Sequence, residues 1–193
     1  DESFEKILSD LKLNKIYGLL LHDEFDIKSE HSDLIFDKLK EYKAKGLVTK
    51  IGVSFYDFDL MNEALHKFDL DLIQVPFNIF DQRLLQPQYS QSLKSKNIEV
   101  HCRSLFLQGV LLKELMKIPE TLSEFNNKFV ELDNFCISKN ISRLEACLKV
   151  GLQSELIDKI VLGITDLSEL NEIVDVLNTL DHRELDFSSL NCT

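Results

Sequence analysis

Short continuous apolar runs alternate with amphipathic stretches along the whole chain of 193 residues. Continuous apolar runs predict buried strands, and apolar residues at helical spacing predict amphipathic helices. The predicted strands cover residues 15–21, 48–53, 71–75, 98–102 and 160–164. Predicted helices precede residue 14 and cover residues 34–45, 58–67, 84–95 and 167–177, and a mostly helical stretch at 109–157 contains a clear helix at 142–152.

Several predicted helices have recognisable ends. Asp57 and Asp166 stand where an N-cap carboxylate would accept hydrogen bonds from amides of the first turn. Gly46 follows the helix at 34–45 and suits the left-handed residue that often ends a helix. The stripe of Leu144, Cys147 and Leu148 is expected to lie in the core. The polar tail after residue 180 is expected to pack loosely.

Five apolar strands, each expected to be buried on both faces and joined by helical crossovers, indicate a parallel α/β sheet covered by helices. Two architectures fit this order, an open doubly wound sheet and a (β/α)8 TIM barrel. No GxGxxG or P-loop sequence follows any predicted strand, which disfavours a doubly wound nucleotide-binding fold. The length suits a single domain over residues 1–193.

Charge and cysteine content exclude several classes of protein. The chain has 22 Lys and Arg against 33 Asp and Glu, a formal net charge of -11, and an acidic surface disfavours nucleic acid as a partner. No apolar run approaches the roughly 20 residues that span a bilayer, so no membrane partner is predicted. The cysteines lack CxxC spacing and are expected to be reduced thiols of a cytoplasmic protein: Cys102, Cys136, Cys147 and Cys192.

Polar residues follow the carboxyl ends of the predicted strands, where parallel α/β folds place their functional groups. His22 ends the first strand, Ser54 follows the second, and Gln74 lies inside the otherwise apolar third strand. A buried glutamine is costly unless it is hydrogen-bonded, which favours a functional or network role. His22 and Asp23 lack a third ligand at suitable spacing, so no metal site is predicted.

In order and over nearly the whole chain, these strand ends resemble those of the aldo-keto reductase family. Members of that family are (β/α)8 barrels that use NADPH or NADH to reduce aldehydes and ketones. The resemblance implies that this chain is the C-terminal portion of such a barrel, with strands four to eight present and the first three strands missing. The chain begins with Asp1 inside a predicted helix, which agrees with a truncated protein.

The resemblance also implies roles for individual residues. His22 matches the histidine that orients and polarises the substrate carbonyl. Ser54 and Gln74 match the side chains that hold the nicotinamide carboxamide. Arg103, in the seventh-strand segment, would stack on the nicotinamide or bind phosphate. The other cofactor-binding residues lie in two segments. A loop along the pyrophosphate contains Ser104, Gln108 and Gly109. The start of a helix at the adenosine end, whose amides would be available to a phosphate, contains Gly163, Thr165, Ser168 and Asn171.

Three departures from the family pattern change these expectations. Phe55 stands where the family usually has asparagine, so one carboxamide contact is expected to be lost. The adenosine segment lacks the Lys or Arg that commonly binds the 2′-phosphate of NADP, and Asp166 and Glu169 would repel it, so NADP and NAD both stay open although the family favours NADP. The family's catalytic Tyr, Asp and Lys come from the first three strands, so little or no activity is expected.

The preferred interpretation is therefore a carbonyl reductase with a small-molecule substrate. The alternative is a cofactor-binding regulatory or interaction subunit without turnover. An unrelated phosphate-binding barrel enzyme, such as an isomerase or aldolase, would need a lysine or a carboxylate pair at the strand ends, and no such lysine is found. Open barrel edges favour self-association or binding of a missing N-terminal fragment. Simpler structural roles stay open for several polar residues: Ser54 as a cap, His101 in its strand, Arg103 in a salt bridge, and Asn78 and Arg83 in a loop.

Overall fold

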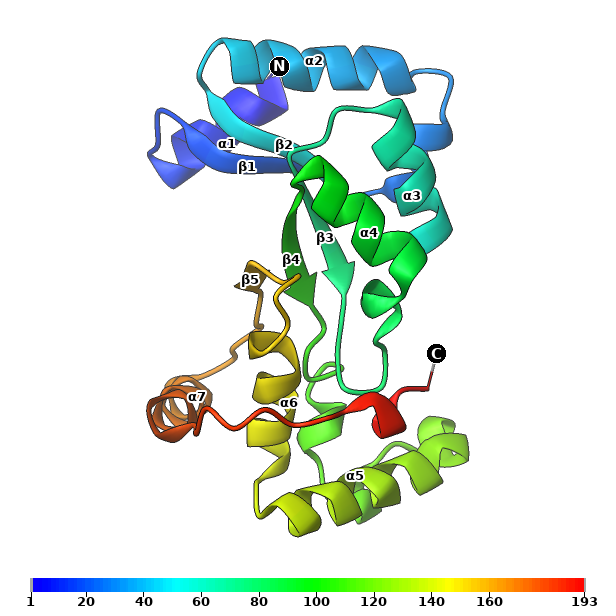
Figure 1. The fold of residues 1–193 in the computed structure, drawn as a ribbon. Coiled ribbons are helices and arrows are strands. Elements are labelled where there is room, and N and C mark those ends of the chain that lie inside the picture. The colour runs from blue at the N-terminus through cyan, green and yellow to red at the C-terminus, as the bar shows by residue number, and fades with distance from the viewer. Residues whose placement is uncertain (1, 193) are drawn as a thin grey trace. The chain divides into compact units, whose positions relative to one another are not determined.

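The computed structural model describes residues 2–192, in which helices and parallel strands alternate (Figure 1). The strands follow the order β1-β2-β3-β4-β5 in one sheet, and β1 pairs with β2, β2 with β3, and β4 with β5, each in parallel. This confirms an α/β fold with five parallel strands. The strand bounds are β1 Ile16–Leu21, β2 Val48–Ser54, β3 Leu72–Pro76, β4 Glu99–Arg103 and β5 Lys159–Ile160.

Helices separate most of these strands, and their predicted caps are confirmed. The Asp57 carboxylate accepts hydrogen bonds from the amides of Asp59 and Leu60 at 2.9 and 3.0 Å. Gly46 has a φ of +72° just beyond the second helix. The α-helices are α1 Glu2–Leu11, α2 Ser32–Ala44, α3 Phe58–Lys67, α4 Pro87–Lys96, α5 Asn126–Lys139, α6 Arg143–Leu152 and α7 Leu167–Thr179. Short 3-10 turns are η1 Glu24–Lys28, η2 Arg83–Leu85, η3 Val110–Leu112, η4 Leu115–Lys117, η5 Glu120–Phe125 and η6 Ser188–Leu190.

The chain divides into two compact units. The first unit comprises Asp1–Val75 and Pro87–Val100, and the second comprises Pro76–Gln86 and His101–Thr193. In the first unit, Phe36 of α2 stacks on Phe68 with 3.7 Å between the ring centroids, and Met61 of α3 is fully buried. In the second unit, α6 buries the predicted stripe of Leu144, Cys147 and Leu148. The single domain expected over residues 1–193 stays a prediction.

The strand predicted over residues 160–164 is present, but it begins one residue earlier and is shorter than expected. β5 ends at Ile160, and only the Val161 amide extends the ladder by donating to the Cys102 carbonyl at 2.8 Å. Val161 and Ile164 are 43% and 41% exposed. A strand at the end of the sheet order gains ladder hydrogen bonds from one neighbour alone, so its apolar sequence does not suffice to keep it extended.

The predicted burial of every strand on both faces is wrong, because no residue of β1 is buried. β1 lies at one end of the sheet order and β5 at the other. The middle strands agree with the prediction, since β3 buries four of its five residues. Apolar composition therefore locates the middle strands but does not distinguish end strands from central ones.

The helix predicted over residues 84–95 begins later than expected. A 3-10 turn, η2, comes first, and α4 begins at Pro87. Gln86 has φ -62° and ψ 137°, the extended conformation favoured by a residue that precedes proline. Pro87 itself suits the first position of a helix, where its missing N–H costs nothing.

The expectation of a loose C-terminal tail is wrong. Leu185, Phe187 and Leu190 are buried, and Lys149 of α6 binds the tail. The Lys149 ammonium, 4% exposed, donates to the carbonyl oxygens of Asp181 and Arg183 and also contacts the Asp181 carboxylate. The tail therefore packs because buried side chains satisfy its backbone polar groups. In the second unit of Figure 1 this segment is drawn in orange and red.

None of the helices in residues 2–192 has the length and apolarity required to cross a membrane. The four cysteines are free thiols, and within the same residues no group of three or more His, Cys, Asp or Glu is arranged to hold a metal. Burial raises the pKa of the Cys102 and Cys147 thiols to about 12, which keeps both protonated at neutral pH.

Candidate functional site

Three predicted site residues of the first unit form a row at the carboxyl ends of neighbouring strands. Ser54, the last residue of β2, pairs directly with Gln74 of β3. Leu21 of β1 pairs with Val53, so His22 follows at the level of Ser54. Adjacent strands lie about 4.8 Å apart, and residues paired in a parallel ladder share a face. We call His22, Ser54 and Gln74 the strand-end row.

The side chains of the strand-end row make no hydrogen bond or ion pair with any other described residue. Ser54 is 7% exposed, Gln74 is half-buried and His22 is exposed. Polar groups inside proteins nearly always have a partner, so water or a ligand must supply one here. The serine hydroxyl and the glutamine amide each combine a donor and an acceptor, which suits a ligand carboxamide.

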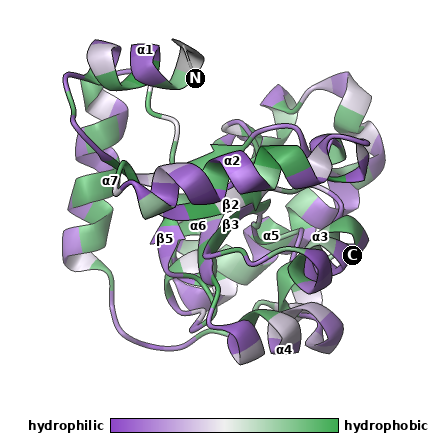
Figure 2. Ribbon diagram, turned by 90° about the horizontal axis from the view of Figure 1, so that it is seen from above, coloured by the Kyte–Doolittle hydropathy of each residue, from purple (hydrophilic) through white to green (hydrophobic). Residues whose placement is uncertain are grey.

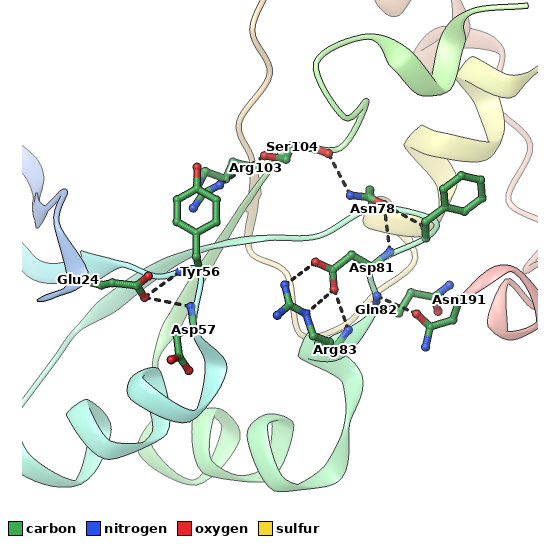
Figure 3. A network of polar contacts seen from close by, with 11 residues as sticks. Glu24, Tyr56, Asp57, Asn78, Asp81, Gln82, Arg83, Arg103, Ser104 and Asn191 are labelled. Carbon is green, nitrogen blue, oxygen red and sulfur yellow. Dashed lines mark hydrogen bonds and ion pairs between the residues drawn. The ribbon is translucent and has the colours of Figure 1, made fainter. Parts of the chain in front are cut away.

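The loop that follows Ser54 is held by Glu24, a residue that sequence analysis missed. Glu24 is 7% exposed, and its Oε2 accepts hydrogen bonds from the amides of Tyr56 and Asp57, both at 3.0 Å (Figure 3). Phe55 is fully buried, and its amide donates to the Gln74 carbonyl at 2.8 Å. The phenylalanine ring therefore lies in the core.

In the second unit, the loop at residues 104–109 has an unusual backbone. Ser104, Leu107 and Gln108 have φ values of 62°, 47° and 55°, and Gly109 has 80°. Each non-glycine residue in this left-handed region costs about 1–2 kcal/mol. The amides of Gln108 and Gly109 donate to no acceptor among residues 2–192. Successive amides of such turns form concave sites for anions, and the role of this loop in binding a pyrophosphate stays a prediction.

Arg103 lies beside this loop. It ends β4, is half-buried, and its Nη1 lies 3.4 Å from the Ser104 Oγ (Figure 3). A guanidinium next to open backbone amides adds positive charge for an anionic ligand. His101, two residues earlier on the same face of β4, is half-buried within the strand, where a structural role was expected.

In the segment predicted to meet the adenosine end of a cofactor, the Ser168 and Glu169 amides of the first turn of α7 are already bonded to a carboxylate. Asp166 Oδ1 accepts from the amides of Ser168 and Glu169 at 2.8 and 3.0 Å, and Glu169 Oε2 accepts from the Thr165 amide at 2.8 Å. The Ser168 hydroxyl also bonds to Asp166 and is the main cause of the lowered pKa of that carboxyl group. The expectation that these amides are available to a phosphate is wrong. The four predicted residues of this segment are all exposed: Gly163, Thr165, Ser168 and Asn171.

A separate hollow of about 450 Å³ in the second unit includes none of the predicted site residues. Arg143 lines it with Lys113, Asp133 and Glu172. The Arg143 Nε lies 2.6 Å from Asp133, and its Nη1 donates to the carbonyl oxygens of Leu111 and Lys113. Its charge and donors are thus engaged by the protein, and this hollow is not assigned to the cofactor.

Known proteins resemble this chain in sequence and in fold. The Aldo/keto reductase family model matches residues 1–190. The uncharacterized oxidoreductase YqkF of Bacillus subtilis (strain 168) is 23% identical over 186 residues, which are 92% of this chain and 60% of that protein.

Solved structures agree on the fold. The aldo-keto reductase AKR11C1 from Bacillus halodurans (holo form) aligns with a TM-score of 0.76 at 15% identity, over 98% of this chain and 65% of that chain. The glycerol dehydrogenase AKR11B4 from Gluconobacter oxydans aligns with a TM-score of 0.63 at 16% identity, over 96% of this chain and 65% of that one. The chain thus spans less than two thirds of these relatives. The family match over almost all of its residues nevertheless shows that the chain belongs to the aldo/keto reductase family.

Proposed function

We propose that this chain is part of an NAD(P)H-dependent oxidoreductase that reduces the carbonyl group of a small aldehyde or ketone. The observation that carries the proposal is the strand-end row, whose three polar side chains have no protein partner among the described residues. Structural polar residues would be expected to have one. Membership of the aldo/keto reductase family makes oxidoreductase chemistry the natural use of such a row.

Each residue of the proposed site has its own role in binding the cofactor or the substrate. The Ser54 hydroxyl and the Gln74 amide bind the nicotinamide carboxamide and so orient the ring. His22 donates a hydrogen bond to the substrate carbonyl oxygen, where negative charge develops during reduction. Within the second unit, the amides of residues 104–109, with Arg103 beside them, are the proposed contacts of a pyrophosphate. The bound nicotinamide supplies the hydride, while the protein orients the reactants and limits access of water.

We further propose that NADH is preferred to NADPH. Asp166 already accepts hydrogen bonds from the Ser168 and Glu169 amides of the first turn of α7, and Glu169 accepts one from the Thr165 amide just before it. A 2′-phosphate placed there would meet like charges and amides of Thr165, Ser168 and Glu169 that already have acceptors. Asp166→Asn keeps a capping side chain while removing one charge, so it should improve NADPH binding more than NADH binding. Preferential loss of NADH binding in the Asp166→Asn variant would support a structural cap alone.

Turnover is a separate question, because the family's Tyr, Asp and Lys are expected to come from the first three barrel strands. We propose that these strands are not part of residues 1–193 and that the chain alone binds cofactor with little or no turnover. The test is cofactor binding by calorimetry, together with cofactor oxidation in the presence of aldehydes and ketones. Both are measured on this chain and on a version extended by the upstream coding region.

Three results distinguish the alternatives. Turnover in the extended protein, with binding alone in the short chain, supports the reductase. Cofactor binding without turnover in both favours a regulatory or interaction subunit. Failure of both proteins to bind NADH or NADPH contradicts the proposal.

We also propose self-association through an apolar face of the second unit. Apolar and polar residues alternate around α7 (Figure 2), and one stripe is 39% to 69% exposed: Leu167, Leu170, Val174 and Leu177. Helices normally cover such a stripe. Size-exclusion chromatography with light scattering should give a species larger than 22.3 kDa that Leu170→Glu returns to monomer. A monomeric unsubstituted chain contradicts association, and an extra mass in the peak identifies a bound fragment instead.

A further inference from the structure

We infer that Asn78 is a positioning residue that prepares the loop at residues 104–109 for a pyrophosphate group. This inference rests on the proposed function, because it concerns the same cofactor. Asn78 follows β3 in the second unit and is 3% exposed. A side-chain amide this deeply buried needs partners for both its oxygen and its nitrogen. Those partners define its role.

The oxygen of the side chain fixes the local turn. Asn78 Oδ1 accepts hydrogen bonds from the amides of Phe80 and Asp81 at 2.9 and 3.0 Å (Figure 3). The backbone groups of Asn78 and Asp81 also exchange two hydrogen bonds of 3.1 Å. Because the oxygen must face these donors, the orientation of the amide is set, and Nδ2 points the opposite way.

The nitrogen of the side chain reaches the start of the loop. Asn78 Nδ2 donates to the Ser104 carbonyl oxygen at 3.4 Å (Figure 3). The same carbonyl accepts from the Leu107 amide at 3.0 Å, and the preceding Phe77 amide donates to the Arg103 carbonyl at 3.0 Å. The turn after β3 is therefore bonded to the last residue of β4 and to the first residue of the loop.

The hydrogen bond from Asn78 Nδ2 to the Ser104 carbonyl oxygen, which we call the tether, explains why the strained backbone of the loop persists. Ser104 is the first residue of the loop with positive φ, and Leu107 and Gln108 follow in the same left-handed region. Such conformations survive where the surrounding structure holds them, and they concentrate at functional sites. Asn78 contacts the loop at the Ser104 carbonyl oxygen. At the other end of the loop, the amides of Gln108 and Gly109 have no acceptor among residues 2–192.

The consequence for binding is specific to one part of the cofactor. Amides that already point to one side bind an anion without the cost of ordering the loop. Loss of the tether should therefore weaken a ligand that carries a pyrophosphate. A ligand that carries only the nicotinamide end should be unaffected, because its proposed contacts, Ser54 and Gln74, belong to the first unit.

The experiment compares Asn78→Ser with the unsubstituted chain by calorimetry. The serine hydroxyl can still accept from amides of the turn, but it is too short to reach Ser104. ADP-ribose carries the pyrophosphate without nicotinamide, and nicotinamide mononucleotide carries the nicotinamide without pyrophosphate. We expect about tenfold weaker binding of ADP-ribose, the effect of roughly one lost hydrogen bond, and a change of less than about twofold for the mononucleotide. Asn127→Ala, an exposed asparagine of α5, is the matched control and should change neither affinity.

Each other outcome has a defined meaning. Unchanged ADP-ribose binding by Asn78→Ser, or equal weakening of both probes, overturns the inference and leaves the proposed function standing. Loss of the folded state in Asn78→Ser, measured by circular dichroism, also overturns it, because the residue would then support the fold in general. Failure of the unsubstituted chain to bind ADP-ribose contradicts the proposed function and the inference with it.

Discussion

The two ends of the strands in the first unit carry polar side chains in opposite states. Toward the amino ends, Tyr17 of β1, Lys50 of β2 and Glu99 of β4 form what we call the paired cluster. The Tyr17 hydroxyl donates to Glu99 Oε2 at 2.5 Å, and the Lys50 ammonium bonds to the same oxygen. Lys50 also lies 5.6 Å from the centre of the Tyr17 ring. Toward the carboxyl ends, the strand-end row has no such partners among residues 2–192.

Lys50 of the paired cluster and Ser54 of the strand-end row lie on the same face of β2, because every second residue of a strand (here Lys50, Gly52 and Ser54) shares a face. The strand itself therefore does not determine whether a polar residue is paired. At one end β1 supplies a phenol and β4 a carboxylate, so the cluster stabilises the sheet. At the other end the neighbours supply unpaired polar groups, so the row is available to a ligand. The comparison separates polar residues that hold the fold from those that serve binding.

The largest effect is expected at Gly52, between the two groups. A Cβ there would lie 1.9 Å from the Leu72 carbonyl oxygen of β3. Gly52→Ala must push β2 and β3 apart, which should lower the free energy of unfolding by about 3 kcal/mol and disturb both groups. Urea denaturation measures the loss. Gly163→Ala is the control, since nothing lies within 4 Å of its added Cβ, and it should change stability by less than about 0.5 kcal/mol. Equal stability of the two variants would refute the close approach of the strands.

The next effect is expected at Glu99, which is 9% exposed. Glu99→Ala leaves Lys50 and the Tyr17 hydroxyl without their shared acceptor, so unfolding should become easier by about 2 kcal/mol. Cofactor binding should not change, because the paired cluster lies away from the strand-end row. Glu30→Ala, whose side chain is 87% exposed, should be nearly neutral in the same denaturation experiment. A large loss of cofactor affinity in Glu99→Ala would contradict the division between the two groups.

How far the sequence predicts this molecule depends on the range of the interactions. Apolar periodicity located β2, β3 and β4 to within one or two residues, since local burial determines those strands. It overestimated the length of the strand at residues 160–164, because the number of neighbouring strands is not a local property. It failed in the tail, where the buried Lys149 reaches carbonyl groups more than thirty residues away.

The candidate site divides in the same way. His22, Ser54 and Gln74 could be predicted because parallel folds place function at the carboxyl ends of strands. Glu24 and Asn78 could not be assigned, because their roles depend on partners that are distant in sequence. Glu24 bonds to amides 32 and 33 residues further on, and Asn78 to a carbonyl 26 residues further on. No spacing rule connects such pairs before the chain has folded.

A smaller effect should appear in the pH dependence of the paired cluster. The hydrogen bond to Glu99 is the main reason that the pKa of Lys50 is raised above its ordinary value of 10.5. The stabilisation is therefore complete below that value and is lost as the pH rises through the raised pKa. Buried thiols such as Cys102, whose pKa is raised, also make the protein less stable as the pH rises. The Lys50→Met variant keeps these thiols, so the difference between it and the unsubstituted chain isolates the contribution of the lysine. The advantage of the unsubstituted chain, about 1 kcal/mol at neutral pH, should shrink above pH 10.5. A constant difference across the alkaline range would count against the paired cluster.

The smallest effect on stability, and the sharpest test of the comparison, is expected in the strand-end row. Gln74→Leu replaces an unpaired amide inside an apolar strand, so the free energy of unfolding should stay within about 1 kcal/mol of its original value or increase. NADH affinity should fall about tenfold in the same variant, because a carboxamide contact is lost. Ser54→Ala should behave alike, whereas Tyr17→Phe, which removes a paired hydroxyl, should lower stability and leave NADH affinity unchanged. Parallel denaturation and calorimetry on the three variants distinguish the groups: if Gln74→Leu lost stability and kept its affinity, the row would belong to the fold, and the assignment of a cofactor to these strand ends would have to be given up.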